Sequence, residues 1–227
     1  MARDVELVVA DDVESAARLV AERLAQGAAE GSEIALTGGS TPGRAYELAA
    51  ELRPDWSGAG IWWGDERCVP PDDDRSNYAL AKKTLLDRLQ AAPRSVHRIR
   101  GEVNPEDAAR EYEEELREVT LDLVLLGLGP DAHVASLFPN EPSLDERDRL
   151  VIPTEPKLDP FVRRISLTLP ALTRAPSVLF FVTGESKAEA AARAFAGPCD
   201  RGSPGSLVRS EQGETVAVLD RAAAGKL

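Results

Sequence analysis

Short apolar runs alternate along the chain with longer amphipathic segments. Six runs rich in β-branched or aliphatic residues predict strands, and five longer segments with helical spacing predict helices. The predicted strands are Val5–Val9, Ile34–Leu36, Ile61–Trp63, Leu121–Leu126, Val178–Val182 and Thr215–Leu219. The predicted helices are Val13–Gln26, Pro42–Leu52, Asn77–Leu89, Pro105–Arg117 and Ser186–Phe195. This alternation predicts an α/β fold, with a mostly parallel sheet flanked by helices.

Four segments refine this picture. Leu121–Leu126 is apolar apart from one aspartate, which is typical of a central strand covered on both faces. Arg163–Leu169 alternates polar and apolar residues, which predicts a half-buried strand. Asn140–Pro160 and Gly197–Pro204 are rich in proline, glycine and charge, so we expect surface excursions rather than interdomain linkers. We therefore expect one domain over residues 1–227.

Composition narrows the class of protein. The net charge of −12 argues against non-specific nucleic-acid binding, which needs a basic surface. No run approaches the roughly 18 apolar residues of a membrane span, and the first residues lack the apolar stretch of a secretory signal. Two cysteines, Cys68 and Cys199, fit a reducing compartment better than a disulfide framework. We expect a cytoplasmic protein, and the sequence leaves its oligomeric state open and compatible with a monomer.

The first candidate for chemistry is LTGGSTP, residues 36–42, between a predicted strand and a predicted helix. Gly38 and Gly39 allow a backbone to approach a ligand closely. Ser40 or Thr41 would cap the helix, and Pro42 suits its first position. Such a helix start offers N–H groups and partial positive charge to an anion, although a plain strand–turn–helix junction is the alternative. The segment lacks the lysine of a P-loop and the spacing of a dinucleotide fingerprint, which disfavours nucleotide binding.

The second candidate is WWGDERCVP, residues 62–70, at the end of another predicted strand. Open α/β sheets bind ligands at this edge. Asp65 and Glu66 can accept hydrogen bonds from sugar hydroxyls, and Arg67 can hold a phosphate. A solvated charge cluster is the alternative. Cys68 has no evident base beside it, so we expect a small buried thiol rather than a nucleophile.

The third candidate is LDLVLLGLGPDAHVASLFP, residues 121–139. An apolar strand ends at Gly127 and Gly129, and Asp131 then leads into a predicted helix. His133 is one of only two histidines, and its place beside the strand end favours a general base over a structural role. Asp131 would cap the helix, orient the imidazole, or do both. His97 has no glycine-rich turn beside it, and we expect it to be structural or exposed.

Because the background charge is negative, an anionic substrate needs local positive charge. Arg164 on the alternating strand and Lys187 near a predicted helix start can supply it together with Arg67. A cation at a helix N-terminus opposes the helix dipole, so Lys187 suggests an anionic partner. An exposed surface lysine is the alternative.

Five segments occur in the order found in 6-phosphogluconolactonases: LTGGSTP, WWGDERCVP with SN after it, DLVLLGLGPDAHVASLFP, RRISLTLPAL and VTGESK. The chain thus resembles the glucosamine-6-phosphate isomerase/6-phosphogluconolactonase family over nearly its whole length. The resemblance implies a Rossmann-like sheet with a small lid-like excursion and a phosphorylated sugar lactone as substrate, with no metal and no organic cofactor. The implied reaction hydrolyses 6-phospho-D-glucono-1,5-lactone. The family usually reads GPDGH, whereas this chain has Ala132, a residue that disfavours positive φ.

The resemblance also assigns roles. His133 is expected to activate water, and Asp131 to hold its ring. The residues expected to bind phosphate and sugar are Gly38, Gly39, Ser40, Thr41, Arg67, Arg164 and Lys187, with Asp65 and Glu66 contacting hydroxyls or positioning the basic residues.

Two other functions are alternatives. One is an aldose–ketose isomerase or deaminase with Asp65 as the base, although ASLFP differs from the deaminase pattern AFNEP. A non-catalytic sugar-phosphate sensor is the other.

Overall fold

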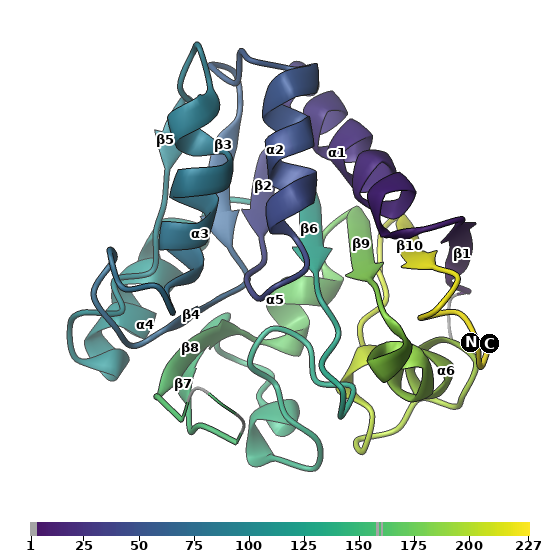
Figure 1. The fold of residues 1–227 in the computed structure, drawn as a ribbon. Coiled ribbons are helices and arrows are strands. Elements are labelled where there is room, and N and C mark those ends of the chain that lie inside the picture. Colours follow the sequence, from purple (N-terminus) through teal and green to yellow (C-terminus); the bar gives the residue numbers. More distant parts are fainter. Residues whose placement is uncertain (1–3, 158, 160) are drawn as a thin grey trace.

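A parallel sheet of seven strands forms the centre of the protein (Figure 1). The structure is a computed structural model that describes residues 4–157, 159 and 161–227. The strands are β1 (Glu6–Ala10), β2 (Glu33–Leu36), β3 (Gly60–Trp63), β5 (Ser95–Val96), β6 (Leu123–Leu126), β9 (Ser177–Val182) and β10 (Glu214–Asp220). They lie in the order β1-β10-β9-β6-β2-β3-β5, and every neighbouring pair is parallel. The predicted α/β fold is confirmed.

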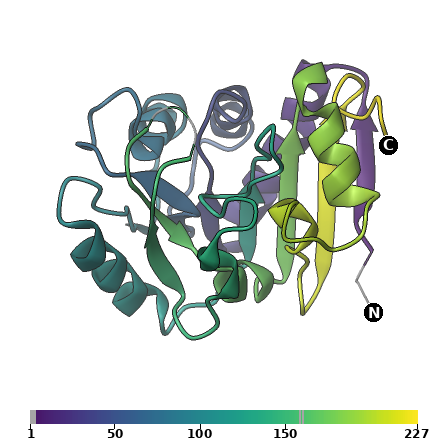
Figure 2. The ribbon, with the colours of Figure 1, turned by 90° about the horizontal axis from the view of Figure 1, so that it is seen from below.

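Helices flank this sheet. They are α1 (Val13–Glu30), α2 (Gly43–Leu52), α3 (Asn77–Thr84), α4 (Pro105–Leu116), α5 (Leu169–Thr173) and α6 (Ala188–Phe195). Four 3₁₀ turns connect elements: η1 (Leu86–Arg88), η2 (Pro142–Asp145), η3 (Glu185–Lys187) and η4 (Pro204–Ser206). Figure 2 shows α2 and α3 on one side of the sheet and α4 on the other. Within the described residues, no helix is long and apolar enough to cross a membrane.

A second, small sheet lies beyond the carboxyl ends of the parallel strands (Figure 1). It is antiparallel and has the order β4-β8-β7, with β4 at Asp65–Arg67, β8 at Arg164–Leu167 and β7 at Val151–Thr154. The predicted excursion Asn140–Pro160 therefore contributes an ordered strand, β7, and a 3₁₀ turn; residues 158 and 160 lie outside the described residues. The small sheet faces the end of the parallel sheet where α/β folds bind ligands.

Strand β8 differs from the predicted half-buried strand. All of its four residues are buried, including Arg164 and Ser166. The polar face does not meet solvent because it packs on the loop that follows β6: the Ser166 hydroxyl accepts a hydrogen bond from the Ser136 N–H at 3.0 Å. The alternating pattern predicts the strand correctly, but Ser166 packs on another part of the protein and Arg164 lines the pocket described below.

Several helix boundaries also differ from prediction. Helix α1 continues to Glu30, where Gly31 ends it with a φ of +77°. Helix α2 begins at Gly43 with Pro42 at the N-cap position and no capping side chain, so the expected cap from Ser40 or Thr41 is wrong. The helix expected after Asp131 is also absent; residues 130–138 form turns closed by a bridge between Val134 and Leu137.

Two buried tyrosines complete the backbone hydrogen bonds where strands β2 and β3 end. The Tyr46 hydroxyl donates to the Thr37 carbonyl at 2.6 Å and accepts from the Thr37 N–H at 3.0 Å. Tyr112 does the same for Trp63, donating to its carbonyl at 3.0 Å and accepting from its N–H at 2.8 Å. Each hydroxyl takes the place of a strand partner, so the loops that follow start from fixed positions.

We predict that Tyr46→Phe lowers the free energy of unfolding by about 1–3 kcal/mol, because it leaves the buried N–H and carbonyl of Thr37 without a partner. Urea denaturation measures the change. Tyr78→Phe is the matched control, since no hydrogen bond of the Tyr78 hydroxyl is found among the described residues, and it should change stability by much less. Equal effects of the two substitutions would contradict the prediction.

Candidate active site

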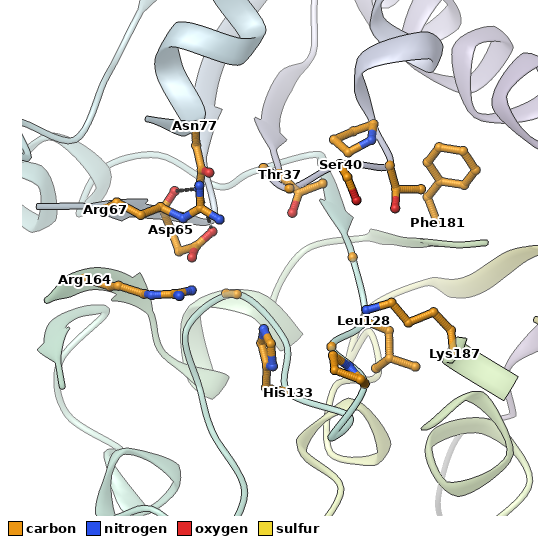
Figure 3. A pocket seen from close by; sticks show the side chains of 18 residues that line it. Thr37, Ser40, Asp65, Arg67, Asn77, Leu128, His133, Arg164, Phe181 and Lys187 are labelled. Carbon is orange, nitrogen blue, oxygen red and sulfur yellow. Dashed lines mark hydrogen bonds between the residues drawn. The ribbon is translucent and has the colours of Figure 1, made fainter. Parts of the chain in front are cut away.

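Loops from the carboxyl ends of β2, β3, β6 and β9 meet the small sheet around a pocket of about 170 Å³ (Figure 3). The sheet order reverses between β2 and β6, and ligands bind at such switch points. All predicted site residues except Asp131 and Glu66 line this pocket: Gly38, Gly39, Ser40, Thr41, Asp65, Arg67, His133, Arg164 and Lys187. Sequence reasoning missed Thr37, Asn77, Leu128, Ala135 and Phe181, which also line it.

His133 and Asp131 form a pair at the edge of the pocket. The His133 Nδ1 atom lies 2.6 Å from Oδ1 of Asp131, and the same oxygen accepts from the His133 N–H at 3.2 Å. The His133 side chain is only 17% exposed, and its ring packs on Phe138 at 4.8 Å between centroids. Because Nδ1 is held by the carboxylate, Nε2 is the ring nitrogen left for chemistry.

A tight turn, not a helix, produces this pair. The Gly129 N–H donates to the His133 carbonyl and the Ala132 N–H donates to the Gly129 carbonyl, both at 2.9 Å. A β-carbon at position 129 would overlap the His133 ring, so glycine is required there. Ala132 has a φ of +70°, a conformation that costs an L-residue about 1–2 kcal/mol. Alanine therefore adopts a strained conformation at the position where the resemblance leads us to expect glycine.

The charge of Asp131 suits it to orient the ring. Burial raises the pKa of Asp131, but the hydrogen bonds and charge of His133 outweigh burial and bring the pKa below its usual value. Asp131 therefore stays ionised at neutral pH and holds His133 by a charge-assisted hydrogen bond.

Asp65 lies between two arginines on the small sheet (Figure 3). Its Oδ1 accepts from Asn77 Nδ2 at 3.0 Å, and its Oδ2 accepts from the Ser136 hydroxyl at 2.6 Å. Burial lowers the pKa of Arg164, the charge of Asp65 opposes this, and the charge of Arg67 adds to it. The Asp65 charge thus favours the charged form of Arg164 beside the like charge of Arg67.

Glu66 lies away from the pocket lining, which does not suit the predicted contact with hydroxyls, whereas the other predicted role, positioning a basic residue, stays a prediction. It is 2% exposed and is not among the pocket residues. Its carboxylate accepts hydrogen bonds from the N–H groups of Arg67, Asn77 and Tyr78 and from the Ser76 hydroxyl, at 2.7–2.9 Å. Burial raises its pKa, and these donors oppose the rise without cancelling it. Glu66 therefore fixes the start of α3, and with it Asn77, rather than contacting a ligand.

The loop before α2 forms the opposite wall of the pocket. A β-carbon at position 38 would overlap Oδ1 of Asn77, which explains Gly38. Gly39 has a φ of +94°, which favours glycine. Because α2 has no capping side chain, its first N–H groups have no partner within the helix and can bind an anion.

Lys187 completes the pocket from the other side (Figure 3). It is the last residue of η3 and directly precedes α6. Burial lowers the pKa of Lys187, and the Asp131 charge opposes the decrease. The pocket therefore has cations on two sides, with His133 between them, in a chain whose net charge is −12.

The remaining candidates lie outside the pocket. Cys68 is half-buried, and burial raises the pKa of its thiol to about 11, which disfavours a nucleophilic thiolate. The His97 ring stacks on Trp62 at 3.9 Å between centroids, and its Nδ1 lies 2.6 Å from Glu115, so His97 is structural. In the described part of the chain, no group of three or more His, Cys, Asp or Glu side chains could hold a metal ion.

Comparison with known proteins places this geometry in a family. Residues 9–217 match the family model for glucosamine-6-phosphate isomerases/6-phosphogluconolactonase. The 6-phosphogluconolactonase of Haemophilus influenzae is 36% identical over 199 residues, which cover 84% of this chain and 85% of that protein. That of Streptomyces coelicolor is 37% identical over 248 residues, covering 98% and 94%.

Solved structures agree with these relatives. The crystal structure of the 6-phosphogluconolactonase from Thermotoga maritima has a TM-score of 0.84 and 30% identity, covering 96% of this chain and 100% of that chain. A monomeric glucosamine-6-phosphate deaminase has a TM-score of 0.87 at 18% identity, covering 98% and 100%, and this likeness shows the shared fold alone. The chain belongs to the glucosamine-6-phosphate isomerase/6-phosphogluconolactonase family.

Proposed function

We propose that this protein is a 6-phosphogluconolactonase, which hydrolyses 6-phospho-D-glucono-1,5-lactone to 6-phospho-D-gluconate in the oxidative branch of the pentose phosphate pathway. The names of its relatives support the reaction. The observation that carries the proposal is the His133 ring, which is held by Asp131 on the wall of a pocket with cations on two sides. Hydrolysis of an anionic lactone requires water, a base to activate that water, and positive charge to bind the anion.

His133 is the proposed general base. Its Nε2 takes a proton from water as the water oxygen attacks the lactone carbonyl carbon. The tetrahedral intermediate then collapses, the bond from that carbon to the ring oxygen breaks, and the imidazolium returns the proton to the ring oxygen. The product is a carboxylic acid with a free hydroxyl, and the acid ionises at neutral pH. Asp131 keeps the ring oriented and stabilises the transient imidazolium charge.

The other pocket residues bind the substrate in this proposal. Arg67, Arg164 and Lys187 supply the positive charge for the phosphate and for the oxyanion that forms at the lactone carbonyl. The N–H groups of the Gly38–Thr41 loop and of the start of α2 add uncharged donors. Because the cations lie on two sides of His133 (Figure 3), phosphate at one side leaves the other available to the lactone.

The structure favours this reaction over a proton transfer between sugar carbons. In an isomerase or deaminase, Asp65 would be the base, but both of its oxygens already accept hydrogen bonds, from Asn77 and Ser136. These bonds hold the carboxylate in place beside protein donors, which suits a structural or electrostatic role. A sugar-phosphate sensor would not need the oriented imidazole of His133.

Three further expectations stay predictions. They are that the chain acts in the cytoplasm, that residues 1–227 form one domain, and that the reaction needs no metal or organic cofactor.

We predict that His133→Ala lowers kcat by about 10²–10⁴-fold, the usual contribution of a general base. The assay follows acid release from freshly made 6-phosphogluconolactone and subtracts the spontaneous hydrolysis. Glu115→Gln removes the negative charge beside the other histidine, His97, and should leave kcat unchanged. Near-normal turnover by His133→Ala would exclude the mechanism. In a separate assay, ammonia release from glucosamine 6-phosphate by the wild-type protein would favour the deaminase alternative.

The Cys68 thiol gives a prediction that depends on pH. With a pKa of about 11, its thiolate fraction rises about tenfold per pH unit below pH 11, and the thiolate is the reactive form. In a Cys199→Ser variant, which leaves Cys68 as the single thiol, the rate of iodoacetamide alkylation should therefore keep rising from pH 8 to pH 10. An alkylation rate that levels off below pH 9 would contradict the raised pKa. Because Cys68 lies outside the pocket, the Cys68→Ser variant should keep full lactonase activity.

A further inference from the structure

The segment from η4 to Arg209 has no role in the mechanism so far. None of residues 204–209 lines the pocket. The segment nevertheless contacts the turn that carries the His133–Asp131 pair and the helix that follows Lys187. Three contacts show how it could control the geometry of the site.

The first contact is a hydrogen bond to the strained residue of the turn. The Gly205 N–H donates to the Ala132 carbonyl at 2.9 Å. Ala132 lies between Asp131 and His133, is fully buried and has a φ of +70°. An L-residue keeps this conformation only where its surroundings hold it. The hydrogen bond from Gly205 therefore holds the backbone of Ala132. That backbone places the side chains of Asp131 and His133 beside one another.

The second contact is tight packing at Gly205 itself. A β-carbon at position 205 would lie 2.6 Å from Cδ1 of Leu128 and 3.1 Å from Cβ of Ala194. Leu128 lines the pocket and precedes the required Gly129, and Ala194 lies in the last turn of α6. A side chain at position 205 would thus push on both elements.

The third contact is made by Arg209. Its guanidinium donates to three backbone carbonyls: those of Gly205 at 2.9 Å, Val208 at 2.7 Å and Ala194 at 2.7 Å. The side chain is half-buried, and burial lowers its pKa. One side chain therefore ties η4 to the end of α6, the helix that begins directly after Lys187.

We propose that Gly205 and Arg209 are positioning residues of the active site, which hold the Ala132 backbone and thereby the contact between Asp131 and His133. Arg209 acts through Gly205, and Gly205 acts through Ala132; neither touches the substrate. The kinetic part of this proposal rests on the proposed lactonase function, whereas the geometric part concerns the imidazole alone. A merely structural role, in which the segment stabilises the fold without setting the site, is the competing explanation.

The test compares Arg209→Met, Arg209→Lys and Gly205→Ala with the wild-type protein. Arg209→Met removes all three donor contacts, and Arg209→Lys keeps the charge but cannot reproduce the planar fork. We expect kcat to fall by about 10–100-fold in Arg209→Met and Gly205→Ala, the scale of a small misplacement of catalytic groups. KM should change by less than about twofold, since no substrate contact is lost. Arg209→Lys should lie between Arg209→Met and the wild-type protein.

A second readout needs no activity. The protein has two histidines, and the Nδ1 atom of each lies 2.6 Å from a carboxylate oxygen. In protein labelled with ¹⁵N at histidine, the His133 ring signals, identified by their loss in His133→Ala, should shift in the variants. The His97 signals, which report the bond to Glu115, should not. If the protein lacks lactonase activity altogether, this spectrum still tests the positioning.

The control is Arg174→Met. Arg174 also donates to a backbone carbonyl, that of Val119 at 2.8 Å, and it is not among the pocket residues. It should lower stability while leaving kcat and both histidine spectra unchanged. If Arg209→Met behaves like this control, or if His97 shifts as much as His133, the proposal is wrong.

A double variant tests the route through Ala132. Glycine adopts a φ of +70° without the cost that alanine pays, so Ala132→Gly should reduce the loss of kcat that Arg209→Met causes. An unchanged loss in the double variant would show that Arg209 does not act through Ala132.

Discussion

The contact between the Asp131 carboxylate and the His133 ring depends on a backbone conformation that few residues tolerate. Asp131 and His133 are two residues apart, and Ala132 between them turns the chain with a φ of +70°. Gly129 leaves space for the ring because any β-carbon there would overlap it. The end of β6 fixes where this turn begins, and the buried residues of that strand hold it in the centre of the sheet.

The rest of the pocket is arranged around this turn by the order of the strands. The chain leaves β2 and β6 on either side of the point where the sheet order reverses, so the Gly38–Pro42 loop faces the turn. The small sheet brings Asp65, Arg67 and Arg164 from distant parts of the sequence to one side. Each wall of the pocket is therefore attached to a buried element.

Much of this arrangement was predictable from sequence. Buried strands such as β6 and β9 have long apolar runs, and strand–glycine–helix junctions indicated where ligands bind. β4 has three residues and β5 has two, which is too short for a periodic pattern to reveal, and the five-residue α5 spans little more than one helical turn. The turn at Asp131 was mistaken for a helix because a proline followed by an acidic residue also begins helices. The surroundings of Glu66 were not predictable. The sequence does not show that four donors, from β4 and the start of α3, surround its carboxylate.

The close approach of Gly38 to Asn77 has a consequence for how such a pocket can diverge. The Asn77 amide occupies the volume that a side chain at position 38 would need, and it also binds Asp65. A larger residue at position 38 requires a smaller one at position 77, and that smaller residue lacks the hydrogen bond to Oδ1 of Asp65. A substitution at position 38 is therefore coupled to position 77 and, through the Asn77 amide, to the Asp65 carboxylate, so the glycine loop and the small sheet do not vary independently.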